Sequence, residues 1–154
     1  MEYAIAKWLH ILSSTILFGT GIGTAFYLLV ATLGRDTRVV AAVSGYVVIA
    51  DWMFTATTVV LQPLTGIWMV HSVGMSWDAA WLHWSLVLYA VAIACWLPVV
   101  WLQLRLRDLA RGAASRGQPL PPLYWRYFRY WVVLGVPAFF AFLAIFYLMT
   151  VKPS

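Results

Sequence analysis

The chain has 154 residues, of which 64% are hydrophobic and only 10% are charged. Soluble domains are apolar over about half of their residues, so this composition excludes an ordinary soluble domain and predicts an integral membrane protein. The single cysteine, Cys95, excludes an intrachain disulfide and any zinc or iron–sulfur site built from cysteines. The net charge of +5 comes mainly from arginines between apolar segments, which indicates membrane topology rather than binding to nucleic acid.

Four long apolar segments follow one another, each longer than the ~20 residues that a transmembrane helix needs. We expect helices over about residues 3–33, 42–72, 78–104 and 124–151. They predict an all-α, up-down four-helix bundle that forms a single domain over residues 1–154. Arginines flank the first and third connections, whereas the second has no lysine or arginine. The positive-inside rule therefore predicts that both termini lie outside, with the lipid bilayer around the bundle.

The first segment places a histidine among apolar residues, about one and a half turns inside its start. At 3.6 residues per turn, one face of this helix carries His10, Ser14, Leu17, Gly21 and Thr24. The small residues would let another helix or a flat cofactor approach the backbone. An imidazole that faces lipid is costly, so an intramembrane histidine indicates a functional site. The alternative is a histidine that bonds to a neighbouring helix or reaches the interface.

The second segment carries a polar stripe, with members three or four residues apart. They are Asp51, Thr55, Thr58, Gln62, Thr65 and Met69. One interpretation is a proton route that begins at Asp51 and continues through Thr55, Thr58 and Gln62. The other is polar packing between helices, with Asp51 near the inner interface and paired with an arginine. Pro63 predicts a kink and leaves a backbone carbonyl free for another partner.

The third segment begins with a second histidine, His83, above a face of small and apolar residues. His10 and His83 both enter from the outer side and lie about 10 Å deep at a rise of ~1.5 Å per residue. Diagonal helices of a bundle would stand about 11 to 14 Å apart, given neighbouring axes ~8 to 10 Å apart. Two imidazoles can bridge that distance with a haem iron between them. Lys7 and Lys152 would then meet the haem propionates, while His71 ends the second segment on the same side.

Two short motifs resemble those of known families. Lys7-Trp8-Leu9-His10 and Trp81-Leu82-His83 are similar to helix starts of the bacterial membrane-embedded porphyrinogen oxidases and, more broadly, of the copper-resistance D membrane family. Nearly the whole chain, including Trp131, Gly135, Pro137-Ala138-Phe139 and Leu148 to Pro153, resembles a bacterial family of predicted integral membrane proteins of unknown function. The oxidase resemblance implies haem binding at His10. Those oxidases typically have a lysine two residues after the histidine of helix three, where this chain has Ser85.

Together these observations predict a multi-pass protein of the bacterial inner membrane that binds haem b. His10 and His83 would ligate the iron, Ser14 and Gly21 would lie beside the haem, and a quinone or redox protein would exchange electrons with it. A haem-dependent oxidoreductase would be one form of this function. The first alternative is copper binding or transport, since Met69, His71 and Met75 add soft ligands on the outer side. The others are a porphyrinogen oxidase-like enzyme and a cofactor-free assembly subunit, and a homo-oligomer is an additional alternative.

Overall fold

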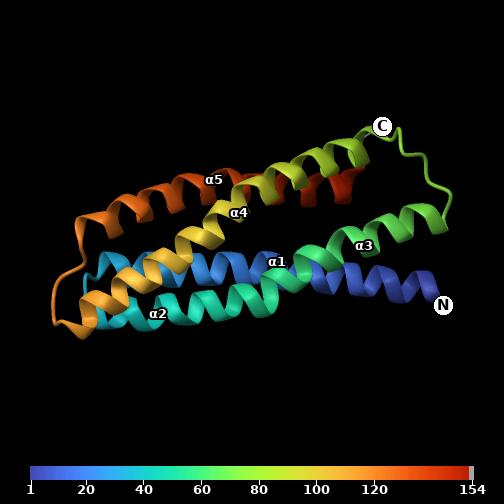
Figure 1. Ribbon diagram of the computed structural model, residues 1–154. Helices are drawn as coiled ribbons and strands as arrows, with labels where there is room; N and C mark the ends of the chain where they lie inside the picture. The colour runs from blue at the N-terminus through green and yellow to red at the C-terminus, as the bar shows by residue number, and fades with distance from the viewer. Residues whose placement is uncertain (153–154) are drawn as a thin grey trace.

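The computed structural model describes residues 1–152, and in that part of the chain four helices are long and apolar enough to cross a membrane (Figure 1). They are α1 (Glu2–Leu33), a composite helix from Thr37 to Ser72, α4 (Ala80–Ser115) and α5 (Pro122–Val151). Successive helices run in opposite directions, so the first and last described residues lie at the same end of the bundle. The predicted all-α up-down bundle is confirmed, while Pro153 of the family resemblance and Ser154 lie outside the described residues.

The composite helix consists of α2 (Thr37–Ala50), the π-helix η1 (Asp51–Thr55) and α3 (Ala56–Ser72). It begins at Thr37 rather than at the expected residue 42, because the side chain of Asp36 caps it. The Asp36 carboxylate accepts hydrogen bonds from the backbone N–H groups of Arg38 (2.9 Å) and Val39 (3.3 Å). The composite helix changes direction near η1 (Figure 1), and π-helices are frequent sites of such bends.

Helix α4 continues to Ser115, which corrects the expected end at residue 104. The charged residues after Leu104 suggested a polar connector, but arginine is a good helix former. A buried face also continues through this segment, at spacings of three or four residues. It consists of Leu102, Leu106, Ala110 and Ala113. The connector to α5 is therefore confined to the short stretch from Arg116 to Pro121.

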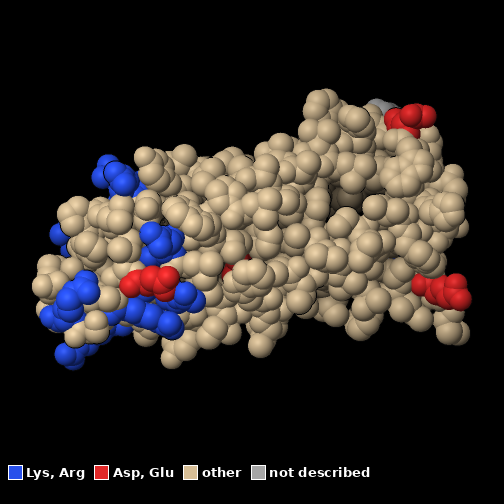
Figure 2. Space-filling view, viewed as in Figure 1, with Lys and Arg blue, Asp and Glu red and all other residues tan. Residues whose placement is uncertain are grey.

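The two ends of the bundle differ in charge. All arginines lie at one end, which we call the basic end (left in Figure 2): Arg35, Arg38, Arg105, Arg107, Arg111, Arg116, Arg126 and Arg129. We call the opposite end, with both chain termini and the connection from Val73 to Ala79, the terminal end. This separation of charge is the pattern from which the sequence predicts the basic end to face the cytoplasm.

The apolar core lies toward the basic end, where α2 packs between α1 and α4. Its buried members are Leu28, Ala31, Val40, Val47, Leu102, Leu106, Ala110, Tyr124, Phe128 and Trp131. Toward the terminal end the helices form two pairs, α1 with α3 and α4 with α5 (Figure 1). Phe18 of α1 joins the pairs, because its ring packs against Phe139, Phe142 and Phe146 of α5.

Candidate functional site

His10 lies in the interface between α1 and α3, where polar side chains of both helices surround it. Its Nδ1 is 2.8 Å from the hydroxyl of Thr65, and its Nε2 is 3.2 Å from Nε2 of Gln62. The Gln62 amide oxygen in turn accepts a hydrogen bond from the hydroxyl of Ser13, which is fully enclosed. We call these four residues, His10, Ser13, Gln62 and Thr65, the His10 network. It joins the first and second spans by side-chain hydrogen bonds on both sides of the imidazole.

The partners of the imidazole fix its tautomer. The Thr65 hydroxyl donates its proton to the backbone carbonyl of Leu61 (2.8 Å), so it accepts a hydrogen bond from Nδ1–H of His10. The Gln62 amide nitrogen can only donate hydrogen bonds, so Nε2 of His10 is the acceptor in this contact. His10 is therefore a neutral imidazole that carries its proton on Nδ1 and keeps a lone pair on Nε2.

Gly66 makes room for this imidazole on α3. A Cβ atom at residue 66 would lie 3.3 Å from Cε1 of His10, closer than nine in ten Cβ contacts in proteins. The ring therefore packs directly against the α3 backbone. The sequence predicts such a close approach at the glycines of α1, but Gly19, Gly21 and Gly23 have nothing within 4 Å of a Cβ position among the described residues.

Pro63 opens a second link, from α3 to α4. Proline has no N–H, so the carbonyl four residues earlier, on Val59, loses its helical partner. The hydroxyl of Tyr89 on α4 donates to this carbonyl at 2.5 Å. The prediction that Pro63 frees a carbonyl for another partner is confirmed.

A buried carboxyl group lies near the middle of the composite helix. Asp51 is 5% exposed and accepts a hydrogen bond of 3.4 Å from the indole Nε1–H of Trp96 on α4. Thr55 follows at the end of η1, 4% exposed, and its hydroxyl has no hydrogen-bond partner in residues 1–152. The arginine partner expected for Asp51 is not found, since the ion pair of the described chain joins Arg107 to Asp108.

The predicted polar stripe lies on the inward face of the composite helix. Asp51, Thr55, Thr58 and Thr65 are buried, and Gln62 and Met69 are half-buried. The Thr58 hydroxyl bonds to the carbonyls of Phe54 and Thr55 within its own helix. The stripe therefore runs from Asp51 to the His10 network as a series of polar groups without an opposing charge.

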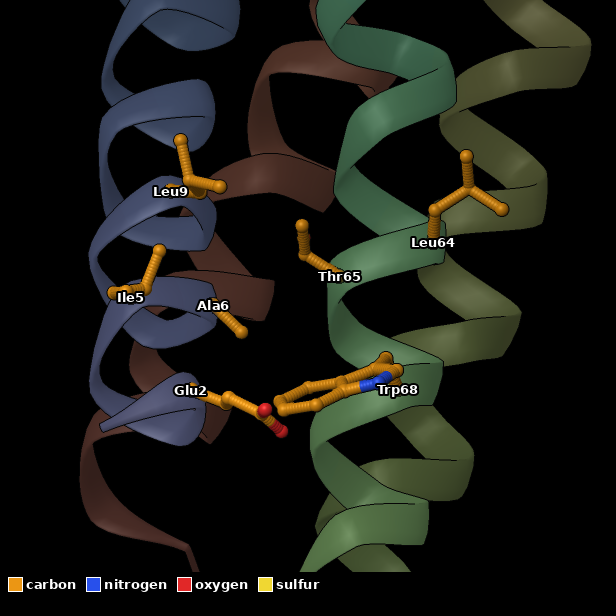
Figure 3. A pocket seen from close by; sticks show the side chains of 7 residues that line it. All are labelled: Glu2, Ile5, Ala6, Leu9, Leu64, Thr65 and Trp68. Carbon is orange, nitrogen blue, oxygen red and sulfur yellow. The ribbon is translucent and has the colours of Figure 1, made fainter.

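A pocket of about 370 Å³ opens beside the network at the terminal end, between α1 and α3 (Figure 3). Its lining is almost wholly apolar and comprises Glu2, Ile5, Ala6, Leu9, Leu64, Thr65 and Trp68. In Figure 3 the Thr65 side chain points into the space between the helices, and the Trp68 indole reaches toward Glu2. Thr65 therefore connects the pocket to His10.

The face of α1 that packs against α3 differs from the predicted face with Ser14 and Gly21. Ser13 is buried and belongs to the network, whereas the Ser14 hydroxyl bonds back to the Ile11 carbonyl and Gly21 is exposed. The buried positions of α1 are Ser13, Leu17, Leu28, Ala31 and Thr32. Ser14 and Gly21 thus do not lie against the groups that hold His10.

The other predicted site residues at the terminal end lie apart from His10. His83 is exposed on α4, with the Trp84 ring as its aromatic neighbour at 6.3 Å, and His71 is exposed near the end of α3. Lys7 is exposed on α1, while Lys152 stands over the Trp81 ring at 5.3 Å. Within residues 1–152, no three His, Cys, Asp or Glu side chains come together as a metal site.

Three residues of the site were missed by the sequence analysis. Ser13 lies three residues after His10, a spacing that places both on one helix face. This spacing is the signal from which Ser13 could have been predicted. The partners on α4, Tyr89 and Trp96, have no comparable signal, because their roles depend on how α4 packs against the composite helix.

Comparison with known proteins gives a family and no function. No curated protein and no solved structure matches the chain. The family model described as "Predicted integral membrane protein (DUF2269)" matches residues 4–153, nearly the whole length. The resemblance to a family of predicted integral membrane proteins of unknown function is therefore confirmed, and the chain belongs to the DUF2269 family.

Proposed function

We propose that the protein binds haem b inside the membrane and passes electrons between that haem and a quinone or a protein partner. The observation that carries this proposal is the pair of contacts at His10, from Nδ1 to the Thr65 hydroxyl and from Nε2 to the Gln62 amide. From these contacts we infer a proton on Nδ1 and a lone pair on Nε2. Histidines that ligate metals hold their other ring nitrogen in such a bond, which fixes the ring and raises its basicity. Haem supplies one-electron chemistry when bound.

The surroundings of Nε2 fit an axial ligand once one side chain moves. Gln62 is half-buried and faces Nε2 through its amide. Rotation of this side chain would break its hydrogen bonds to His10 and Ser13 and free the lone pair, while Thr65 keeps the ring in place. A separate apolar pocket lies at the same end of the bundle, where Thr65, the partner of Nδ1, lines it. Apolar lining of this kind is typical of cofactor sites.

His83 would be the second histidine to hold the iron. Its imidazole is exposed at the terminal end, beside the Trp84 ring. His10 and His83 belong to different helix pairs, and Figure 2 shows the surface hollowed between the pairs toward the terminal end. Two histidines would give a six-coordinate iron suited to electron transfer, whereas His10 alone would leave a position open for oxygen or substrate.

Absorption spectroscopy of the purified protein tests this proposal. We expect a Soret band and sharp reduced bands in the wild type, and loss of the bound haem in His10→Ala. His83→Ala should retain haem but change it from low spin to high spin. His71→Ala is the matched control, because His71 is exposed near the end of α3 and should leave the spectrum unchanged. Full haem occupancy in a folded His10→Ala variant would overturn the proposal.

The alternatives have less support and predict other spectra. For copper, no group of three or more His, Cys, Asp or Glu side chains comes together in the described chain, and His71 is exposed whereas Met69 is half-buried. For porphyrinogen oxidation, Ser85 stands where those oxidases carry lysine, and its buried hydroxyl bonds to the Trp81 carbonyl at 2.7 Å. Metal without porphyrin would indicate copper, and a protein that takes up neither would be a cofactor-free assembly subunit.

A further inference from the structure

Asp51 is the acidic residue that the fold carries deep into a membrane span. It lies close to the middle of the span from Thr37 to Ser72 and is 5% exposed. The other acidic residues lie at the ends of the bundle: Glu2, Asp36, Asp78 and Asp108. A charged carboxylate at this depth is costly, and carboxyl groups inside membrane spans commonly take part in proton or ion pathways.

The backbone at Asp51 is also unusual. Asp51 begins the π-helix η1, and the N–H of Ala56 bonds to the carbonyl of Asp51, five residues back. Single π-turns inside α-helices are rare and occur frequently at functional sites. Here the π-turn begins at Asp51 and ends at Thr55, and both side chains are buried.

The groups around Asp51 include hydrogen-bond donors but no cation. Trp96 donates its indole N–H, and the Thr55 hydroxyl is buried without a partner in residues 1–152. The elements packed around η1 carry other titratable groups. They include His10, Tyr27, Tyr46, His71, Tyr89, Cys95, Arg105 and Arg111. None of them forms an ion pair or hydrogen bond with Asp51 in the described chain.

A neutral carboxyl group is the form that this setting favours, because no positive charge offsets a carboxylate. Hydrogen bonds from these two donors can nevertheless stabilise a carboxylate for a short time. The proton of Asp51 can therefore leave and return. The way out is asymmetric. Toward the basic end the buried residues of α2 include one polar side chain, Ser44, whose hydroxyl bonds back to the Ala41 carbonyl at 3.2 Å. Toward the terminal end the polar stripe leads to the His10 network and the pocket at Thr65.

We infer that Asp51 is a proton-binding site in the membrane interior that exchanges its proton with water at the terminal end along Thr58, Gln62 and Thr65. In each exchange the O–H bond of the carboxyl group breaks and its electron pair stays on Asp51. The proton passes to water at the terminal end, and the carboxylate is held by Trp96 N–H and Thr55 O–H until a proton returns. The binding site at Asp51 needs no haem, so its test is independent of the function proposed above. Only the route shares residues with the His10 network, namely Gln62 and Thr65.

Infrared spectroscopy of the full-length protein in lipid tests the binding site. At neutral pH we expect the C=O stretching band of a protonated carboxylic acid, with a downward shift in D₂O. The band should be absent in Asp51→Asn and present in Asp108→Asn, a control that removes an exposed carboxylate paired with Arg107. The site is overturned if the wild type lacks the band, or if a folded Asp51→Asn variant keeps it.

The rate of the deuterium shift tests the route. Gln62→Leu should keep the band and slow its shift roughly tenfold, the effect of about 1.4 kcal/mol on a barrier. Thr58→Val is isosteric, should act in the same direction, and keeps the test open if Gln62→Leu fails to fold. Val60→Ala, on the exposed face of the same helix, should exchange at the wild-type rate. Wild-type exchange in both polar-face variants would overturn the route.

Discussion

The basic and terminal ends of the bundle are held together by different interactions. At the basic end, aromatic and aliphatic side chains of four helices interlock, and Tyr124, Phe128 and Trp131 form a stacked series along α5. The Tyr124 hydroxyl is bonded to Thr32 at 2.8 Å, so this contact satisfies both hydroxyl groups. At the terminal end the helix pairs separate, and α1 is joined to α3 through the His10 network.

This difference between the two ends indicates that the part of the bundle that stabilises the fold is not the part that carries the proposed chemistry. Lipid chains are as apolar as leucine, so helix association in a membrane depends on close packing and on hydrogen bonds between helices. Packing dominates at the basic end, where it fixes the bundle. Toward the terminal end the hydrogen bonds of the His10 network join α1 to α3, the surface is hollowed, and a pocket reaches Thr65 (Figures 2 and 3). The chemistry proposed above therefore rests on the less tightly packed part of the molecule.

The largest expected effect is in cysteine labelling from one side of the membrane, because each position is either labelled or not. In a Cys95→Ser background, Ser76→Cys lies in the terminal connection and Gln118→Cys in the basic one, and both positions are exposed. We expect an impermeant maleimide to label residue 76 in intact spheroplasts and residue 118 only after lysis, as the positive-inside rule requires. The opposite pattern would place the His10 network and the pocket toward the cytoplasm.

Truncation of a core leucine should produce the next largest effect. Leu106 is fully buried and Leu97 is 59% exposed, and both belong to α4. Leu106→Ala should lower the free energy of unfolding by about 2 to 4 kcal/mol through lost packing and a residual cavity. Leu97→Ala should change it little, because lipid or detergent refills the space. Reversible unfolding in mixed micelles measures both, and equal losses would mean that the basic end is not the packed core.

The helices could be predicted from sequence because length and hydropathy are local properties. Two helix bounds differ from the predicted ones. The composite helix begins at Thr37 because the Asp36 side chain caps it, and α4 extends to Ser115 because its buried face continues through the polar segment. The polar stripe and the free carbonyl near Pro63 were also predictable, since each follows from helical spacing or from the missing N–H of proline.

The partners of His10 were not predictable, for a physical reason. In a membrane both the lipid-facing and the protein-facing sides of a helix are apolar, so the rotation of α1 about its axis has little sequence signal. A rotation that favours Ser13 over Ser14 directs His10 toward Gln62 and Thr65 of α3. Equal depth of His10 and His83 follows from counting residues, but whether a ligand joins them depends on side-chain directions that spacing does not give.

The smallest effect should come from adding one methyl group beside His10. Gly66→Ala would place Cβ 3.3 Å from Cε1 of an imidazole that hydrogen bonds hold on two sides, and should cost roughly 1 to 2 kcal/mol of unfolding free energy through overpacking. Gly21→Ala is the matched control, since nothing lies within 4 Å of its Cβ position in the described chain. It should be neutral or stabilise the helix by up to about 1 kcal/mol.

A double-variant cycle with His10→Ala then isolates the contact that separates these two glycines. In the His10→Ala background the imidazole is gone, so Gly66→Ala should lose most of its cost, whereas Gly21→Ala should keep the same effect in both backgrounds. A coupling confined to Gly66 would show that His10 packs on the α3 backbone in the folded protein. If Gly66→Ala costs the same with and without the imidazole, His10 faces another direction, and the network on which both proposals draw has to be rebuilt around a different rotation of α1.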